Sequence, residues 1–274
     1  MFPAGHYYSP LPDLEEVRRN EKTIFDRSTP NLSGINLNES GQINFFHECK
    51  KFYKELPFPA QKKEEYRYFY ENPSFSYADA IMLFFMIRFL KPKKIIEIGS
   101  GCSSRLMLDT NEFFFKDKIS VTCIEPYPDL LLSLIKKEDR HKITLLDKKL
   151  QDCDLSLFSS LEKNDILFID STHVSKIGSD VNLIFFKILP LLREGVHIHF
   201  HDVFFPFEYL KEWVYEGRAW NENYILRAFL EYNEKFTIVF FNSFIAFFHL
   251  DLFQKWAPLC LKNTGGSFWM KKGR

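Results

Sequence analysis

Acidic and imidazole side chains follow two short apolar runs in the second half of the chain. Asp170 ends one run, and His173 stands three residues later; His201 and Asp202 end the next. An imidazole beside carboxylates can serve as a general base near neutral pH, and one nitrogen with two carboxylates can also hold a divalent cation. Asp170, His173 and Asp202 are therefore candidate catalytic residues and candidate metal ligands, and the residue types leave both roles open.

The run that ends at His201 holds two further histidines at alternate positions. His197, His199 and His201 share one face of a strand because side chains repeat with a period of two. His197 and His199 lie too early in the strand to reach its end, so we expect them to be packed in the core. His201 stays a candidate for binding a substrate.

A glycine-containing turn follows the first apolar run, in a chain that has only 11 glycines among 274 residues. Gly99 and Gly101 allow a tight turn and the close approach of a ligand to the backbone, and the next helix presents free N–H groups there. Ser104 stands where a dinucleotide fingerprint would have its third glycine, which disfavours a pyrophosphate site. Glu97, Gly99, Gly101 and Ser103 are candidate cofactor-binding residues.

Acidic residues follow the next apolar runs as well. Glu125 comes directly after the second run, where a carboxylate can accept hydrogen bonds from both ribose hydroxyls of a nucleoside. Asp152 follows the third run and is a weaker candidate for the amine of an adenine ring. With Asp170 after the fourth run, these acids complete the predicted cofactor site.

An unusually aromatic segment over residues 204–224 follows the fifth run. Trp220, Glu222 and Tyr224 belong to it, and together with His201 they are candidate residues for binding an acceptor. Aromatic faces beside polar groups suit a sugar or another polyhydroxylated molecule. A packed helical insertion with no binding role is the alternative.

Between residues 95 and 200, short apolar runs alternate with segments of helical pattern. The runs are Ile95–Ile98, Ile119–Ile124, Ile143–Leu146, Ile166–Ile169 and Val196–Phe200. Helices are expected over Asp129–Lys137 and Asp180–Leu192. Strands that alternate with helices indicate a parallel sheet covered on both faces, and ligands of such sheets bind at the carboxyl ends of the strands. The sequence predicts an α/β fold with a Rossmann-like, doubly wound, mainly parallel sheet of seven strands.

The last two strands are expected near the C-terminus. Phe236–Phe241 and Ile245–Leu250, separated by Asn242 and Ser243, predict an antiparallel hairpin. We expect the main domain to span residues 91–274, with the aromatic insertion at about 204–224.

An arm and a helical cap are expected over residues 1–90. Four prolines break residues 1–40, which predicts an extended arm with little regular structure. Apolar residues at helical spacing predict one helix between Ile43 and Leu56 and a second over Ser76–Leu90, with Ser76 as its cap.

Composition excludes several classes of protein. The chain has 36 basic and 36 acidic residues, so its zero net charge gives no sign of a nucleic-acid partner. No apolar run approaches the ~18 residues that span a membrane, and no signal peptide is visible at the N-terminus. Five scattered cysteines without a CxxC pair argue against disulfides and zinc–cysteine sites. These features predict a cytoplasmic protein.

The ordered motifs resemble those of class I S-adenosylmethionine-dependent methyltransferases. Glu97-Ile98-Gly99-Ser100-Gly101 resembles their first motif, with Glu125 as the ribose-binding acid. The order of the later motifs resembles a branch of small-molecule and sugar O-methyltransferases, often encoded near polysaccharide genes. These motifs are Asp170-Ser171-Thr172-His173, His201-Asp202, Arg218–Tyr224 and Gly265–Trp269.

The resemblance implies S-adenosylmethionine as cofactor and a small-molecule or glycan acceptor, with polysaccharide biosynthesis as a context. His173 is the preferred base, with a divalent cation as the variant. Metal dependence does not carry over, because His201-Asp202 replaces the Asp-Asn pair of the metal-dependent catechol-type pattern.

Other functions stay open from the sequence. A nicotinamide-dependent oxidoreductase would share the architecture, and a catalytically silent member would bind the nucleoside without turnover. The aromatic surface is also compatible with a homodimer.

Overall fold

A seven-stranded sheet forms the centre of the computed structural model, which describes residues 2–274. Its strand order is β3-β2-β1-β4-β5-β7-β6, and all neighbours are parallel except β7, which runs antiparallel to β5 and β6. The strands are β1 (Lys94–Ile98), β2 (Ser120–Ile124), β3 (Ile143–Leu146), β4 (Ile166–Ile169), β5 (His197–Phe200), β6 (Phe236–Phe241) and β7 (Phe268–Lys272). The predicted fold class is confirmed, and the first five strands lie within one residue of their expected bounds.

The predicted partner of β6 was wrong. Residues 245–250 do not form a strand, since α12 (Asn242–Phe248) and the start of α13 (Leu250–Trp256) occupy them. In α12, Phe244 and Ile245 are buried while Phe247 is 53% exposed, which is the one-sided burial of a surface helix. The true partner of β6 is β7, whose apolar residues Phe268–Met270 follow a pair of glycines.

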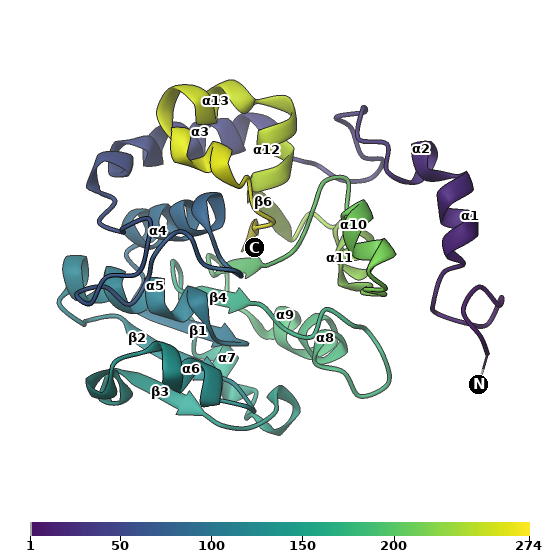
Figure 1. The fold of residues 1–274 in the computed structure, drawn as a ribbon. Coiled ribbons are helices and arrows are strands. Elements are labelled where there is room, and N and C mark those ends of the chain that lie inside the picture. Colours follow the sequence, from purple (N-terminus) through teal and green to yellow (C-terminus); the bar gives the residue numbers. More distant parts are fainter. Residues whose placement is uncertain (1) are drawn as a thin grey trace.

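Helices lie on both faces of the sheet (Figure 1). The remaining α-helices are α1 (Leu14–Arg19), α2 (Glu21–Ile24), α3 (Glu39–Cys49), α4 (Tyr77–Leu90), α5 (Cys102–Thr110), α6 (Asp129–Leu134), α7 (Ser156–Ser159), α8 (Asp180–Leu183), α9 (Leu189–Leu191), α10 (Lys211–Tyr215) and α11 (Glu222–Leu230). Short 3-10 and π segments extend several of them. Helix α4 packs beside α5, and α5 packs beside α6.

The N-terminal region is more regular than expected. The arm holds the short helices α1 and α2, which correct the prediction of little regular structure, and both lie near α10 (Figure 1). Lys211 Nζ bonds Glu21 across this contact at 2.6 Å. The expected helices are present as α3 and α4. Ser76 occupies the N-cap position of α4, but its side chain makes no capping hydrogen bond.

The strand order reverses between β1 and β4, which places a crevice outside the carboxyl ends of these two strands. Gly99 follows β1 with φ +76°, and a Cβ at this position would lie 1.8 Å from the carbonyl oxygen of Asp170. Only glycine fits this close approach of two strand ends. The fold therefore brings the glycine turn directly against the first residue after β4.

The described part of the chain, residues 2–274, holds no helix long and apolar enough to cross a bilayer. All five cysteines lie in this part, and none is paired with another.

Candidate active site

The glycine turn is held from behind by Glu97, the fourth residue of β1. Glu97 is fully buried, and its carboxylate accepts hydrogen bonds from the hydroxyls of Ser103 and Ser104 at the start of α5. Burial raises the pKa of Glu97 to about 7 against the opposing effect of these hydroxyls. Ser104 Oγ in turn accepts from the Gly101 N–H. Glu97 therefore faces the helix that supports the turn and is not among the residues that line the two cavities beside it.

Glu125 closes the turn from the next strand end. Its Oε2 accepts from the Ser100 N–H at 3.2 Å, and its Oε1 accepts from the Tyr127 N–H at 2.9 Å. These bonds fix the carboxylate at the carboxyl end of β2, one strand away from Gly99.

Two cavities meet at this edge of the sheet. One has a volume of about 500 Å³ and extends past Glu125 toward Gln151 and Lys176. The other has a volume of about 440 Å³ and extends past Gly101 under the segment that carries Phe75. Gly99, Glu125 and Asp170 line both. The two hollows therefore offer one elongated ligand two compartments on either side of the strand ends.

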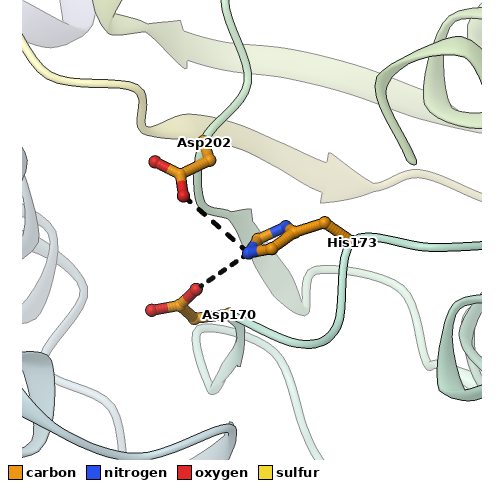
Figure 2. A group of neighbouring side chains, drawn as sticks. All are labelled: Asp170, His173 and Asp202. Atoms are coloured by element: carbon orange, nitrogen blue, oxygen red, sulfur yellow. Dashed lines mark ion pairs between the residues drawn. The ribbon is translucent and has the colours of Figure 1, made fainter. Parts of the chain in front are cut away.

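Asp170, His173 and Asp202 come together beyond β4 and β5, as Figure 2 shows. His173 Nε2 lies 3.3 Å from Asp170 Oδ1 and 3.8 Å from Asp202 Oδ2. One ligand atom from each residue falls within 4.8 Å of the others. Asp170 belongs to both this cluster and the cavities, so the cluster borders the space where a ligand would lie.

The other side of His173 is held by the segment that begins α11. Its Nδ1 lies 2.9 Å from Glu222 Oε2, and the N–H groups of Asn221 and Glu222 donate to its carbonyl oxygen. Trp220 stacks on the imidazole with ring centroids 4.4 Å apart. Glu222 is only 1% exposed. Trp220 and Glu222, two of the residues predicted to bind an acceptor, thus orient His173.

His201 joins the cluster from β5. Its Nδ1 lies 3.5 Å from both Asp170 Oδ1 and Asp202 Oδ1, and its Nε2 lies 3.5 Å from Asp79 Oδ2 on α4. His197 and His199 are buried below it, and His199 Nε2 bonds Ser267 Oγ at 2.9 Å. The expectation that these two histidines belong to the core is confirmed.

The charges of the cluster shift one another. Burial lowers the pKa of His173, but Asp170 and Glu222 outweigh it and raise this pKa to about 10. Burial also lowers the pKa of His201, but Asp202 and Asp170 outweigh this effect and raise the pKa. The two imidazoles hold the pKa of Asp170 below its usual range despite burial, whereas burial raises the pKa of Asp202. The neighbouring carboxylates therefore favour the protonated form of both imidazoles.

Two members of the cluster have an uncommon backbone conformation. His173 and Asp202 have φ values of +58° and +59°. Side chains with a Cβ rarely adopt this left-handed region, and such strain gathers at functional sites. The carboxylates of Asp170 and Asp202 both face Nε2 of His173 (Figure 2).

A third cavity of about 400 Å³ lies between the arm and the aromatic segment. Residues of the arm from Pro10 to Phe25 form one wall, and Trp220 and Tyr224 belong to the other. Tyr224 Oη donates to Glu208 Oε1 at 2.5 Å. Trp220 therefore lies between this cavity and His173.

The predicted cofactor residues fall into two groups. Gly99, Gly101, Ser103, Glu125 and Asp170 line the first two cavities. Glu97 stands behind the turn, and Asp152 is exposed and absent from the cavity walls, where its neighbour Gln151 lies.

Sequence reasoning missed Phe69, Phe75 and Arg105 in the second cavity. Phe69 and Phe75 precede α4, in a region expected only to form a cap. Arg105 carried a signal, since it is a cation inside an otherwise small or apolar helical segment.

The chain is similar to known proteins over its central part. Residues 96–203 match the model of a family described as "Methyltransferase domain". An uncharacterized protein of Archaeoglobus fulgidus is 38% identical over 169 residues, which cover 61% of this chain and 76% of that protein. At this identity and coverage the two chains belong to one family.

Solved structures with similar folds include two methyltransferases. PaMTH1 of Podospora anserina, bound to S-adenosylhomocysteine, is 15% identical, with 97% of this chain and 99% of that chain covered and a TM-score of 0.46. The O-methyltransferase TomG of Streptomyces achromogenes, in complex with S-adenosylmethionine, is 12% identical, with 96% and 97% covered and a TM-score of 0.44.

The matched domain spans β1 to the turn after β5, and it contains the glycine turn, Glu125 and the cluster at Asp170. The chain thus shares its family with the Archaeoglobus fulgidus protein, and its residues 96–203 match a methyltransferase domain.

Proposed function

We propose that the protein transfers the methyl group of S-adenosylmethionine to a hydroxyl of a small polar or sugar-like acceptor. The observation that carries this proposal is the position of Asp170, which lines both cavities and contacts His173 and His201. A methyl donor bound in the cavities would lie beside a cluster of side chains that can accept a proton from the acceptor.

In this proposal the donor's adenosine occupies the cavity between Glu125 and Lys176. Glu125 binds the ribose hydroxyls, since its carboxylate lines both cavities and lies beside the glycine turn. The space beside Gly101 is open, since no protein atom lies within 4 Å of the place where a Cβ would stand. A ligand can therefore approach the backbone of Gly101 directly. Glu97 supports the turn and makes no ligand contact.

The chain's part in the reaction is to hold the acceptor and remove its proton. S-adenosylmethionine supplies a methyl group on a sulfonium, and the bond from this methyl to sulfur breaks as the acceptor oxygen bonds to the carbon. His173, in its neutral form, takes the hydroxyl proton at Nε2. Glu222 fixes the ring through Nδ1, and Asp170 and Asp202 stabilise the imidazolium that results.

The acceptor enters, in this proposal, from the cavity between the arm and the aromatic segment. Glu208 and Arg218 are the charged groups of its wall, beside Tyr209, Trp220 and Tyr224. Such a wall suits a small molecule with hydroxyl groups. Because Trp220 separates this cavity from His173, we expect the indole to shift when the acceptor binds.

A divalent cation is the variant. Four carboxyl groups surround the two imidazoles, since Asp170, Asp202 and Glu222 lie beside His173 and Asp79 lies beside His201. Asp170, Asp202 and neutral His173 offer two oxygens and a nitrogen, a mixed set that fits a transition-metal ion. Such an ion would stabilise the negative charge on the acceptor oxygen.

The test combines binding with turnover. We expect S-adenosylhomocysteine to bind the wild-type protein in calorimetry, and methyl transfer from labelled donor to appear in a panel of polyhydroxylated acceptors. His173→Ala should keep this binding and slow transfer ~10²–10⁴-fold. With His173 as base, the wild-type rate should rise with pH toward about 10, because the neutral imidazole gains population.

Three outcomes would contradict parts of the proposal. Wild-type turnover in His173→Ala removes the histidine as base. Donor binding without transfer to any acceptor indicates a silent, nucleoside-binding protein. A rate that EDTA abolishes and a metal ion restores selects the cation variant.

A further inference from the structure

Arg105 is a buried cation without a carboxylate partner. The residue is 4% exposed, and among residues 2–274 it forms no ion pair within 4.0 Å. Its Nη2 contacts the Cys102 thiol at 3.3 Å, and its Nε has no hydrogen-bond partner. A charge taken out of water without a partner costs several kcal/mol. The site therefore suits an anion that the chain itself does not provide.

The guanidinium belongs to the wall of the 440 Å³ cavity, one turn into α5 from the glycine turn. The Phe69 ring packs against it, with 4.8 Å between the guanidinium carbon and the ring centroid. This contact fixes the side chain without neutralising its charge. Asp109, one helical turn further on, is already bonded to Arg67 and is not free to pair with Arg105.

The charges along this cavity change sign. Arg105 lies in its wall together with Glu125 and Asp170, the two acids that also line the neighbouring compartment. A ligand that fills both compartments therefore meets a cation in one of them and carboxylates where they join. S-adenosylmethionine has a matching pattern, with a carboxylate at one end and a sulfonium and ribose hydroxyls in its middle.

We propose that Arg105 binds the carboxylate of the amino-acid part of S-adenosylmethionine. The proposal rests on the methyl donor of the proposed function and assigns the 440 Å³ cavity to the donor's amino-acid end. It also explains why a buried arginine without a carboxylate partner is kept in the wall of this cavity.

Calorimetry with two ligands tests the proposal, because decarboxylated S-adenosylmethionine lacks only the carboxylate. The wild-type protein should bind S-adenosylmethionine about 10- to 100-fold more tightly than the decarboxylated form, as expected for hydrogen bonds to charged groups. Arg105→Gln should lose this preference by weakening only the carboxylate-bearing ligand. Arg105→Lys should keep part of it.

Two controls separate the possible results. Arg193→Gln removes a surface arginine whose side chain is 60% exposed and should leave the preference unchanged. Unchanged affinity of Arg105→Gln for the decarboxylated ligand shows that the variant folds. Should this variant not fold, Arg105→Lys, which keeps the charge, takes its place, and a full preference in that variant would overturn the role of the guanidinium.

Equal binding of both ligands by the wild-type protein would overturn the role of Arg105, and so would a full preference in Arg105→Gln. Binding of neither ligand by the wild-type protein would overturn the proposed function as well.

Discussion

Arg67 and Arg105 are buried almost equally, at 6% and 4% exposed, but their surroundings differ completely. The Arg67 guanidinium bonds Asp109, Asp139 and Glu112 at 2.6–2.8 Å, and its own N–H donates to Asp109. Arg105, one turn before Asp109 on α5, has no carboxylate partner in the described part of the chain. Arg67 is thus a closed site, whose charge is paired by carboxylates of the chain, and Arg105 is an open site, whose charge is unpaired beside a cavity.

The difference separates structural from functional burial of charge. The Arg67 cluster ties the segment before α4 to α5 and to the turn around Asp139, and each of its charges has a partner. Burying a charged group that keeps no partner is costly, and a fold keeps such a group where a ligand completes it. The sequence does not show this difference, since the carboxylate partners of Arg67 lie 42 to 72 residues away from it.

The largest expected effect comes from opening the closed cluster. Arg67→Met leaves the carboxylates of Asp109 and Asp139 buried without their cation, and the free energy of unfolding should fall by about 3–5 kcal/mol. Arg105→Met removes a charge that no carboxylate balances, so the ligand-free variant should be at least as stable as wild type. Urea unfolding of both variants makes the measurement. Equal losses of unfolding free energy in the two variants would contradict the distinction between the paired Arg67 and the unpaired Arg105.

A smaller change in stability should appear when a ligand binds in the cavity beside Arg105. S-adenosylhomocysteine at 100 times its dissociation constant should stabilise the wild-type protein by about 2.7 kcal/mol, because it binds only the folded state. The same ligand concentration should stabilise Arg105→Met clearly less. Thermal unfolding with and without ligand measures both values. An equal gain in the variant would show that Arg105 does not take part in binding.

The sequence predicted the parts of the site that are local in the chain. The first five strands and the residues at their ends follow from apolar runs and the turns behind them, which is why Gly99, Glu125, Asp170 and Asp202 were found. These residues converge because the carboxyl ends of parallel strands meet at one edge of the sheet. Local pattern and topology together were sufficient for them.

Features that depend on distant contacts were missed. Nothing near Glu222 in the sequence shows that its carboxylate would bond His173, 49 residues earlier. The apolar residues 245–250 fit a strand as well as a helix, and only the folded structure shows that α12 and α13 occupy them while β7 pairs with β6. The sequence shows Arg105 as a cation in a mostly apolar helical segment, but only the folded structure shows that it is buried without a carboxylate partner among residues 2–274.

The smallest expected effect is the contribution of Glu112, at the edge of the Arg67 cluster, to stability at low pH. Lys142 and Arg67 lower the pKa of Glu112 from 4.5 to about 2. The folded state therefore binds this proton less readily than the unfolded chain, so the contribution of Glu112 is present above pH 4.5 and disappears as the pH falls toward 2. Because its side chain is 36% exposed and screened by water, we expect Glu112 to contribute only about 1 kcal/mol to the free energy of unfolding.

Urea unfolding between pH 7 and pH 3 should show a shallower decline in the free energy of unfolding for Glu112→Gln than for wild type. Glu162→Gln, a surface control whose contacts with Lys93 and Arg193 are 3.9 and 4.0 Å long, should follow the wild-type curve. A decline in Glu112→Gln as steep as that of wild type would place the acid sensitivity outside the Arg67 cluster.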